Sequence, residues 1–101
     1  MRREESLQNS KKAMQEGRLR DAAGSLEQAL EQYPGDRALL LELVPLLEQL
    51  ELQDDLLIRL GEALESAPAD SELRMVRARI LASLGRFEES TLDYREVLSA
   101  E

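Results

Sequence analysis

A repeat with a fixed spacing of 34 residues constrains this chain more than any other feature of its sequence. Pro34 and Pro68 stand 34 residues apart, and the residues before them recur with the same spacing. The recurring set is Leu26, Ala29 and Leu30, then Leu60, Ala63 and Leu64, then Tyr94, Val97 and Leu98. A period of this size is typical of a chain that repeats one small unit. We therefore expect one domain over residues 1–101, with repeats near 3–36, 37–70 and 71–101.

Each repeat divides into two stretches with helical periodicity. The second stretch carries apolar residues spaced three and four apart, as on the buried face of an amphipathic helix. In the three repeats this face is Leu19, Ala22, Ala23, Leu26, Ala29, Leu30 and Tyr33; Leu56, Leu57, Leu60, Ala63, Leu64 and Ala67; and Phe87, Thr91, Tyr94, Val97 and Leu98. The first stretch of the last repeat is Leu73, Val76, Ile80, Leu81 and Leu84, with Arg77 expected to reach solvent along its stem. The sequence predicts six helices, near residues 3–16, 19–33, 37–50, 53–67, 71–84 and 87–100.

Glycine, proline and aspartate mark the ends of these helices. Gly17 and Gly85 stand where a helix must end in a left-handed residue before the chain turns back. Glu51 takes that place in the middle repeat, so we expect its turn to be less regular. In the turns between repeats, proline ends one helix and aspartate accepts the free N–H groups of the next. These turns are Pro34-Gly35-Asp36 and Pro68-Ala69-Asp70.

The composition favours one folded, water-soluble domain. The chain has 101 residues, of which 43% are hydrophobic, enough to offset the entropy of ordering. No run of about 20 apolar residues is present, and the first residues lack the apolar core of a signal peptide. We therefore expect no membrane contact and a cytoplasmic location. The absence of cysteine removes disulfides and thiolate sites without defining a compartment.

Charge is unevenly distributed along the chain. Residues 1–20 carry six Lys or Arg against three acids, whereas residues 21–72 carry two Arg against thirteen acids. Such a middle segment repels the phosphate backbone, which excludes nucleic acid as its partner. Two interpretations of the acidity stay open. It is either a solvated surface that favours solubility or a surface that attracts a basic segment of a partner.

The residues that enzymes and cofactor sites need are largely missing. The chain has neither His nor Cys, so catalysis would depend on carboxylates. The adjacent acids at 54–55 and 88–89 point about 100° apart on a helix and cannot easily share a substrate. No phosphate-binding loop or calcium loop occurs, so we expect no enzyme activity and no cofactor. A basic group, Arg74, Arg77 and Arg79, is interpreted as a solvated ion-pair face with Glu72, Glu88 and Glu89.

The unit of two helices with this punctuation resembles the tetratricopeptide repeat over nearly the whole chain. The matching residues are Gly17, Leu19, Ala22, Leu26, Ala29 and Pro34; Leu40, Leu43, Leu56, Leu60, Ala63 and Pro68; and Gly85, Phe87, Tyr94 and Leu98. The first helix departs from the family pattern, with Ser6, Asn9 and Ser10 where the family prefers Trp, Leu and Gly, and is a weak copy. The resemblance implies an all-α fold, a right-handed solenoid of three helix-turn-helix units with six antiparallel helices.

The resemblance also implies a concave groove lined by the first helix of each unit, in which the family commonly holds a peptide. Matching positions by register places eleven groove candidates on these helices: Leu7, Lys11 and Met14; Leu41, Glu42, Pro45 and Glu48; and Glu72, Met75, Val76 and Arg79. The carboxylate clamp of chaperone-binding members needs Lys, Asn and Arg at five groove positions. Those positions hold Leu7, Lys11, Glu42, Glu72 and Val76, so a clamp is not expected.

The apolar groove candidates suggest a different ligand. Leu7, Met14, Leu41, Met75 and Val76 form an apolar track with an acidic rim, suited to an amphipathic segment with basic flanks. The alternative is that these residues are ordinary core contacts. Residues 39–52 hold eight Leu and one Val, more than one buried face needs, so we expect neighbouring helices or a partner to cover the excess. Pro45 is expected to kink this helix or shift its start.

Repeat arrays usually end in a polar helix that shields the last stacking face, and residues 87–100 do not supply one. Leu81, Leu84 and the outer side of the last helix are therefore expected to leave an apolar patch. A homodimer through this face is one solution, and further helices of a longer chain are the other. Two functions follow: a module that binds a protein or peptide in its groove as adaptor, chaperone or assembly scaffold, or a structural or oligomerisation segment with no groove ligand.

Overall fold

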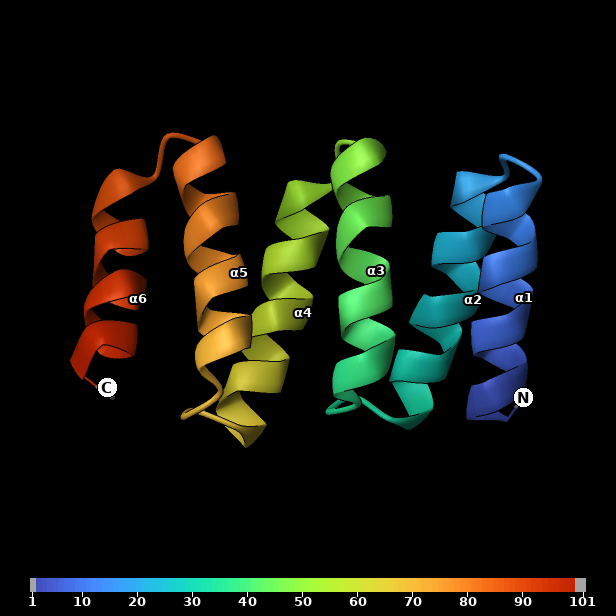
Figure 1. The fold of residues 1–101 in the computed structure, drawn as a ribbon, viewed down its shortest axis with the longest axis horizontal. Coiled ribbons are helices and arrows are strands. Elements are labelled where there is room, and N and C mark those ends of the chain that lie inside the picture. Colours follow the sequence, from blue (N-terminus) through green and yellow to red (C-terminus); the bar gives the residue numbers. More distant parts are fainter. Residues whose placement is uncertain (1, 100–101) are drawn as a thin grey trace. The chain divides into compact units, whose positions relative to one another are not determined.

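The computed structural model describes residues 2–99 and shows six α-helices connected by short turns (Figure 1). The helices are α1 (Arg3–Gln15), α2 (Leu19–Gln32), α3 (Arg37–Gln49), α4 (Gln53–Ser66), α5 (Ser71–Ser83) and α6 (Phe87–Ser99). No strand occurs in this range. Each helix begins at the residue expected from the sequence, and α1 to α5 end one residue earlier than expected. The expected last residue of α6, residue 100, lies outside the described residues.

The chain forms two compact units, Met1–Leu56 and Leu57–Glu101, with the boundary inside α4. In the first unit α2 packs against both α1 and α3, and in the second unit α5 packs against α6. The helix pairs α1–α2 and α5–α6 are hairpins of the kind that the 34-residue repeat predicts. The fold class is all-α, as expected.

The core of the first unit is built around α2, whose apolar face lies between its two neighbours. Alanine allows close approach of the helices, and leucine fills the remaining space. The buried residues are Ala13, Ala22, Ala23, Leu26, Ala29, Leu30, Leu39, Leu40, Leu43, Val44, Leu46, Leu47 and Leu56. The chain itself thus covers most of the leucine-rich helix α3. Tyr33 and Ala67, expected on the buried faces, follow the ends of α2 and α4 and are exposed.

In the second unit, α6 does not bury most of the face that its sequence predicts to be buried. Its buried residues are Leu60, Ala63, Leu64, Leu73, Ala78, Ile80, Leu81, Ser90, Asp93 and Val97. Of the face expected to be buried on α6, Phe87, Tyr94 and Leu98 are 66%, 38% and 68% exposed. The equivalent face of α2 packs against α3, whereas no described helix covers it on α6. A face that is apolar by period is therefore buried only where a neighbouring helix exists.

All three turns within the hairpins have the same structure, including the one expected to be less regular. Gly17 and Gly85 have φ angles of 75° and 78°, and Glu51 has a φ of 59°. The N–H of Leu52 donates to the carbonyl of Leu47 (2.8 Å), the pattern of a helix that closes with a left-handed residue. The expectation of a different turn at Glu51 was wrong, because the closing hydrogen bonds impose the left-handed conformation even on a residue with a side chain.

The turns between hairpins follow the prediction. The carboxylates of Asp36 and Asp70 accept hydrogen bonds from the N–H groups of Leu39 (3.2 Å) and Leu73 (3.1 Å). Asp36 and Asp70 are therefore the N-caps of α3 and α5. The expected shift of the start of α3 does not occur, because the helix runs unbroken from Arg37 through Pro45 to Gln49.

Candidate functional site

The groove candidates lie on the first helix of each repeat, which is α1, α3 or α5. Except for Glu72, each has a 34-residue equivalent among the others: for example, Leu7 on α1 corresponds to Leu41 on α3 and to Met75 on α5. None of the eleven candidates is buried. The α1 and α3 members belong to the first compact unit, and the α5 members belong to the second.

The apolar groove candidates differ from the core residues of the same helices. Met14 and Met75 are 36% and 44% exposed. Leu7, Leu41 and Val76 are half-buried. On each helix they alternate with fully buried neighbours, such as Leu40 and Leu43 beside Leu41. Met14 and Met75 are thus not core residues, and their side chains are accessible from solvent.

The charged groove candidates are also accessible. Lys11, Glu72 and Arg79 are exposed, and Glu42 and Glu48 on α3 are half-buried. Pro45 lies on the same exposed face of α3, where it cannot donate a backbone N–H to the carbonyl of Leu41. The exposed face of α3 therefore combines one proline, one leucine and two acids.

The two residues suggested for self-association are in different environments. Leu81 is 4% exposed and belongs to the core, so it cannot contribute to an exposed patch. Leu84, the C-cap residue of α5, is 39% exposed. On α6, Phe87, Leu92 and Leu98 are more exposed than Leu84, at 66%, 60% and 68%.

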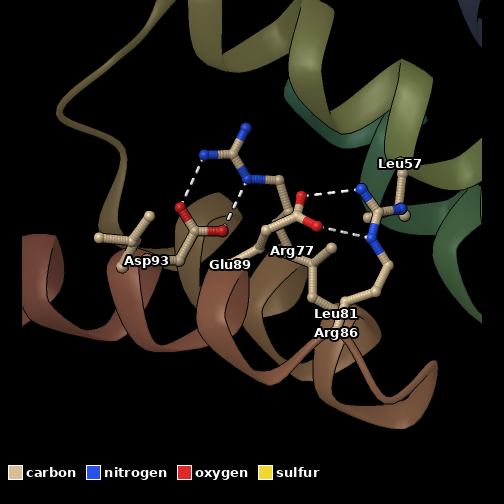
Figure 2. Close-up of a pocket in the computed structure, with 7 residues that line it drawn as sticks. Leu57, Arg77, Leu81, Arg86, Glu89 and Asp93 are labelled. Carbon is tan, nitrogen blue, oxygen red and sulfur yellow. Dashed lines mark hydrogen bonds and ion pairs between the residues drawn. The ribbon is translucent and has the colours of Figure 1, made fainter.

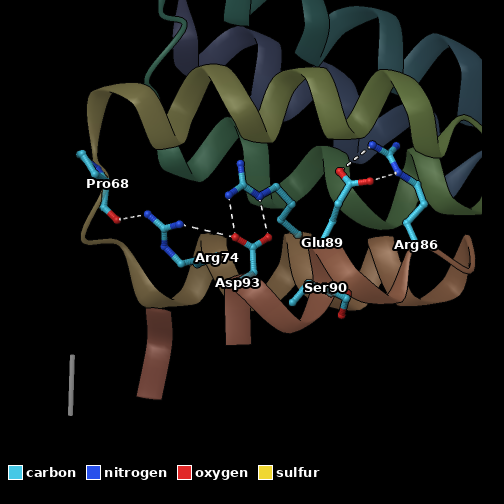
Figure 3. A network of polar contacts seen from close by, with 8 residues as sticks. Pro68, Arg74, Arg86, Glu89, Ser90 and Asp93 are labelled. Atoms are coloured by element: carbon cyan, nitrogen blue, oxygen red, sulfur yellow. Dashed lines mark hydrogen bonds and ion pairs between the residues drawn. The ribbon is translucent and has the colours of Figure 1, made fainter. Parts of the chain in front are cut away.

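A buried carboxylate joins α5 and α6 (Figure 3), and sequence reasoning missed it. Asp93 is 4% exposed and accepts two hydrogen bonds from Arg77, at 2.7 Å from Nε and 2.6 Å from Nη2. Arg74 approaches the same carboxylate at 3.5 Å and also donates to the carbonyl of Pro68. Ser90 donates to the carbonyl of Ala78 (2.8 Å). Four polar residues thus fasten α6 to α5.

The Arg77–Asp93 pair overturns the expectation that Arg77 reaches solvent. The hydrogen bond to Asp93 raises the pKa of the Arg77 guanidinium, partly offset by burial. Glu89, which was grouped with these arginines, instead pairs with Arg86 at 2.7 Å, and this hydrogen bond lowers the pKa of Glu89. The sequence contained one signal for this buried ion pair. Ser90 and Asp93 are polar residues spaced three apart, and they share a helical face with the apolar Val97.

A pocket of about 350 Å³ lies in the second unit beside these ion pairs (Figure 2). It is lined by Leu57, Arg77, Leu81, Arg86, Glu89, Leu92 and Asp93. Arg77 and Arg86 already bind carboxylates of this chain. The pocket therefore presents balanced ion pairs and the apolar surface of Leu57 and Leu92, and none of the groove candidates lines it.

Helical hairpins that recur every 34 residues, with the same closing turn and the same aspartate cap, define an α-helical repeat protein. The family model described as "Tetratricopeptide repeat" matches residues 7–55 and 59–100. The chain therefore belongs to the tetratricopeptide repeat family, and its six helices fit the helical solenoid of helix-turn-helix units expected from the resemblance. No curated protein matches the chain.

Membership in the family defines the broad kind of activity. Tetratricopeptide repeats are generally protein–protein interaction modules, and the family is typically a scaffold without enzyme activity. The proteins of this family typically bind proteins or peptides. Within residues 2–99, none of the helices has the length and apolar character needed to cross a bilayer.

Proposed function

We propose that this chain binds a peptide or protein segment along the exposed faces of α1, α3 and α5. The observation that carries the proposal is the repetition of accessible apolar side chains at equivalent positions, Leu7, Leu41 and Met75. Apolar side chains that three successive repeats keep accessible are suited to a shared ligand, because each repeat contributes the same surface.

The ligand best suited to these faces is an amphipathic segment with basic flanks. Methionine side chains adapt to differently shaped apolar surfaces, and Met14 and Met75 are both accessible. The acids Glu42, Glu48 and Glu72 would attract Lys or Arg next to the apolar residues of the ligand. The net charge of −8 would add a long-range attraction for a basic partner, screened over about 10 Å in salt.

A second function has its own supporting observation. The exposed apolar residues of α6 suit packing against another helix, as in an oligomerisation or structural segment. This face contains none of the groove candidates, so the two functions are separable by mutation.

The groove proposal is tested by placing charges on two equivalent positions. Leu41→Glu together with Met75→Glu should reduce capture of partners from the native lysate at least tenfold, since two buried apolar contacts are worth more than 1.4 kcal/mol together (~2–3 kcal/mol). The same loss is expected for an amphipathic, basic-flanked peptide selected from a random library, measured by fluorescence anisotropy.

The control variant is Ile58→Glu, which changes a more exposed aliphatic residue on α4, outside the groove helices. Met75→Glu alone guards against misfolding caused by the half-buried Leu41, and circular dichroism checks that all variants fold. If the double variant binds as tightly as Ile58→Glu, the groove proposal is wrong.

A further inference from the structure

Helix α6 exposes a continuous apolar seam. Phe87, Thr91, Tyr94 and Leu98 follow one another at intervals of four, three and four residues, the spacing of the contact positions of a two-stranded coiled coil. All four residues are exposed, and Phe87 and Leu98 are the most exposed large apolar side chains of α6. The spacing places the four side chains in one line along the helix, which is a surface for another helix.

The chain itself shows what covers this face elsewhere. In α2 the residues 68 positions earlier, Leu26 and Leu30, correspond to Tyr94 and Leu98. Both are fully buried, and α2 packs against the following helix α3. The natural cover for the seam is therefore a helix that presents its own apolar line.

We propose that the α6 seam pairs with the α6 seam of a second copy of this chain, antiparallel and about a two-fold axis. In this register Phe87 lies opposite the partner's Leu98, and Thr91 lies opposite the partner's Tyr94. The two-fold symmetry repeats each contact once. The dimer therefore has two outer layers, each of Phe87 and Leu98, and two central layers, each of Thr91 and Tyr94.

Charge selects this pairing over others. Glu88 and Arg95 flank the seam on its open side, seven residues apart, and both are exposed. Antiparallel pairing sets Glu88 opposite the partner's Arg95 and, by symmetry, Arg95 opposite the partner's Glu88, so this flank carries two pairs of opposite charges. In a parallel pairing the two residues would be about 10 Å apart along the axis, and neither would be neutralised.

The other flank of the seam is already occupied. Ser90 and Val97 are buried in the chain's own core, and Ser90 donates a hydrogen bond to Ala78 of α5. Only the flank with Glu88 and Arg95 is therefore available to select a partner, and its charges are self-complementary in the antiparallel orientation alone.

Head-to-tail stacking of α6 on the first helix of another copy is disfavoured. The buried positions Leu39, Leu43 and Leu46 of α3 correspond to exposed polar residues of α1, which are Glu5, Asn9 and Lys12. Placing α6 against them would bury charged side chains against leucine and phenylalanine, which is costly. The structure thus favours a closed dimer over an open filament.

The dimer is tested by the mass of the intact chain in solution. One helix of this length supplies an interface at the small end of specific contacts, so the expected affinity is in the micromolar range. Sedimentation velocity from low micromolar to millimolar concentration should show a monomer converting to a dimer. Leu98→Glu should weaken the dimer at least tenfold, whereas Leu92→Glu, at a comparably exposed leucine off the seam, should not.

Charge reversal tests the orientation. Glu88→Arg and Arg95→Glu should each weaken the homodimer by about tenfold, because each sets like charges opposite one another in both symmetry-related pairs. The double variant should recover the wild-type affinity. A mixture of the two single variants should form a heterodimer in preference to either homodimer, since both pairs then join Arg with Glu.

Several outcomes would overturn the proposal. The first is a chain that stays monomeric at every concentration, which would leave the seam to a different protein. Another is a dimer that survives Leu98→Glu, which would place the interface elsewhere. A third is single charge reversals without rescue in the mixture, which would exclude the antiparallel register. Because α6 carries no groove candidate, Leu98→Glu should leave peptide binding unchanged, so failure here is distinguishable from failure of the proposed function.

Discussion

A glutamate in the left-handed region is the most unusual residue of the backbone. Glu51 occupies the position that glycine holds at Gly17 and Gly85, with a φ of 59°. A residue with a Cβ in this region costs about 1–2 kcal/mol relative to right-handed backbone. At Gly17 and Gly85 an added Cβ would meet no heavy atom within 4 Å, so backbone conformation is the main cost of substitution there. The three turns therefore form a matched set for measuring this cost.

Replacing Glu51 with glycine should stabilise the protein. We expect Glu51→Gly to raise the free energy of unfolding by roughly 0.5 kcal/mol. Glycine relieves the backbone strain of the folded state, but it also loses more conformational entropy on folding, which offsets part of the gain. Gly17→Ala and Gly85→Ala should each lower the free energy of unfolding by about 1 kcal/mol. Urea denaturation followed by circular dichroism measures all three. A lower stability of Glu51→Gly would show that the glutamate side chain makes an interaction that offsets the strain.

Asp36 combines two roles at one residue. Its carboxylate caps α3 through the N–H of Leu39 (3.2 Å) and accepts hydrogen bonds from Arg3 of α1, one of them at 3.3 Å. Burial opposes ionisation, but the hydrogen bonds from Arg3 and from backbone N–H groups outweigh it and lower the pKa of Asp36. The ionised form is therefore stabilised in the folded state.

The lowered pKa of Asp36 predicts a pH-dependent difference between the wild type and Asp36→Asn. The asparagine keeps the cap but loses the ion pair, so at pH 7 we expect the variant to be less stable by about 0.5 kcal/mol, allowing for solvent screening. Because the folded pKa lies below the unfolded value of about 3.9, this difference is present above pH 4 and disappears as the pH falls below it. Thermal melts across this range test the prediction, and a difference that does not shrink as the pH falls would contradict it.

At the scale of elements, buried polar contacts hold α6 against α5. Asp93 in the buried face of α6 is held by Arg77 and Arg74, and Ser90 is bound to a backbone carbonyl. In α1 the hydroxyls of Ser6 and Ser10 are buried without a hydrogen-bond partner. Buried unpaired hydroxyls reduce the stability of a helix's packing.

The unequal partners of Asp93 predict unequal mutational effects. Arg77→Met should destabilise the protein by about 2 kcal/mol, because it leaves a buried carboxylate with one distant cation. Arg74→Met should cost less than about 1 kcal/mol, since the bidentate pair remains. Replacing both charges, in Arg77→Met with Asp93→Leu, should recover much of the loss. Chemical denaturation gives the three values, and equal effects of the two arginine variants would refute this ranking.

At the scale of the whole molecule, equivalent residues have different environments although the repeat makes their helices alike. Leu26 and Leu60 are fully buried, whereas Tyr94 at the same position of the third repeat is 38% exposed. Each repeat is covered by what packs beside it, and this is a property of the array. The exposed faces that remain, the groove candidates and the α6 seam, are where we place the functions of the protein.

The sequence alone determined the features that depend on neighbours along the chain. The 34-residue period defined the family, and helical spacing together with Asp36 and Asp70 located the helices to within one residue. These features follow from hydrogen bonds and side-chain spacing over a few residues, which a sequence shows directly. The groove candidates were carried over by register from the resemblance to the family, and they stay a proposal.

Only the tertiary structure decided which apolar faces are covered and where buried charges find partners. The burial of Leu81, the exposure of Leu98 and the pairing of Arg77 with Asp93 all depend on helices packed side by side. Periodicity shows that a face is apolar, but burial and ion pairing require a second surface within a few ångströms, and that surface comes from elsewhere in the fold.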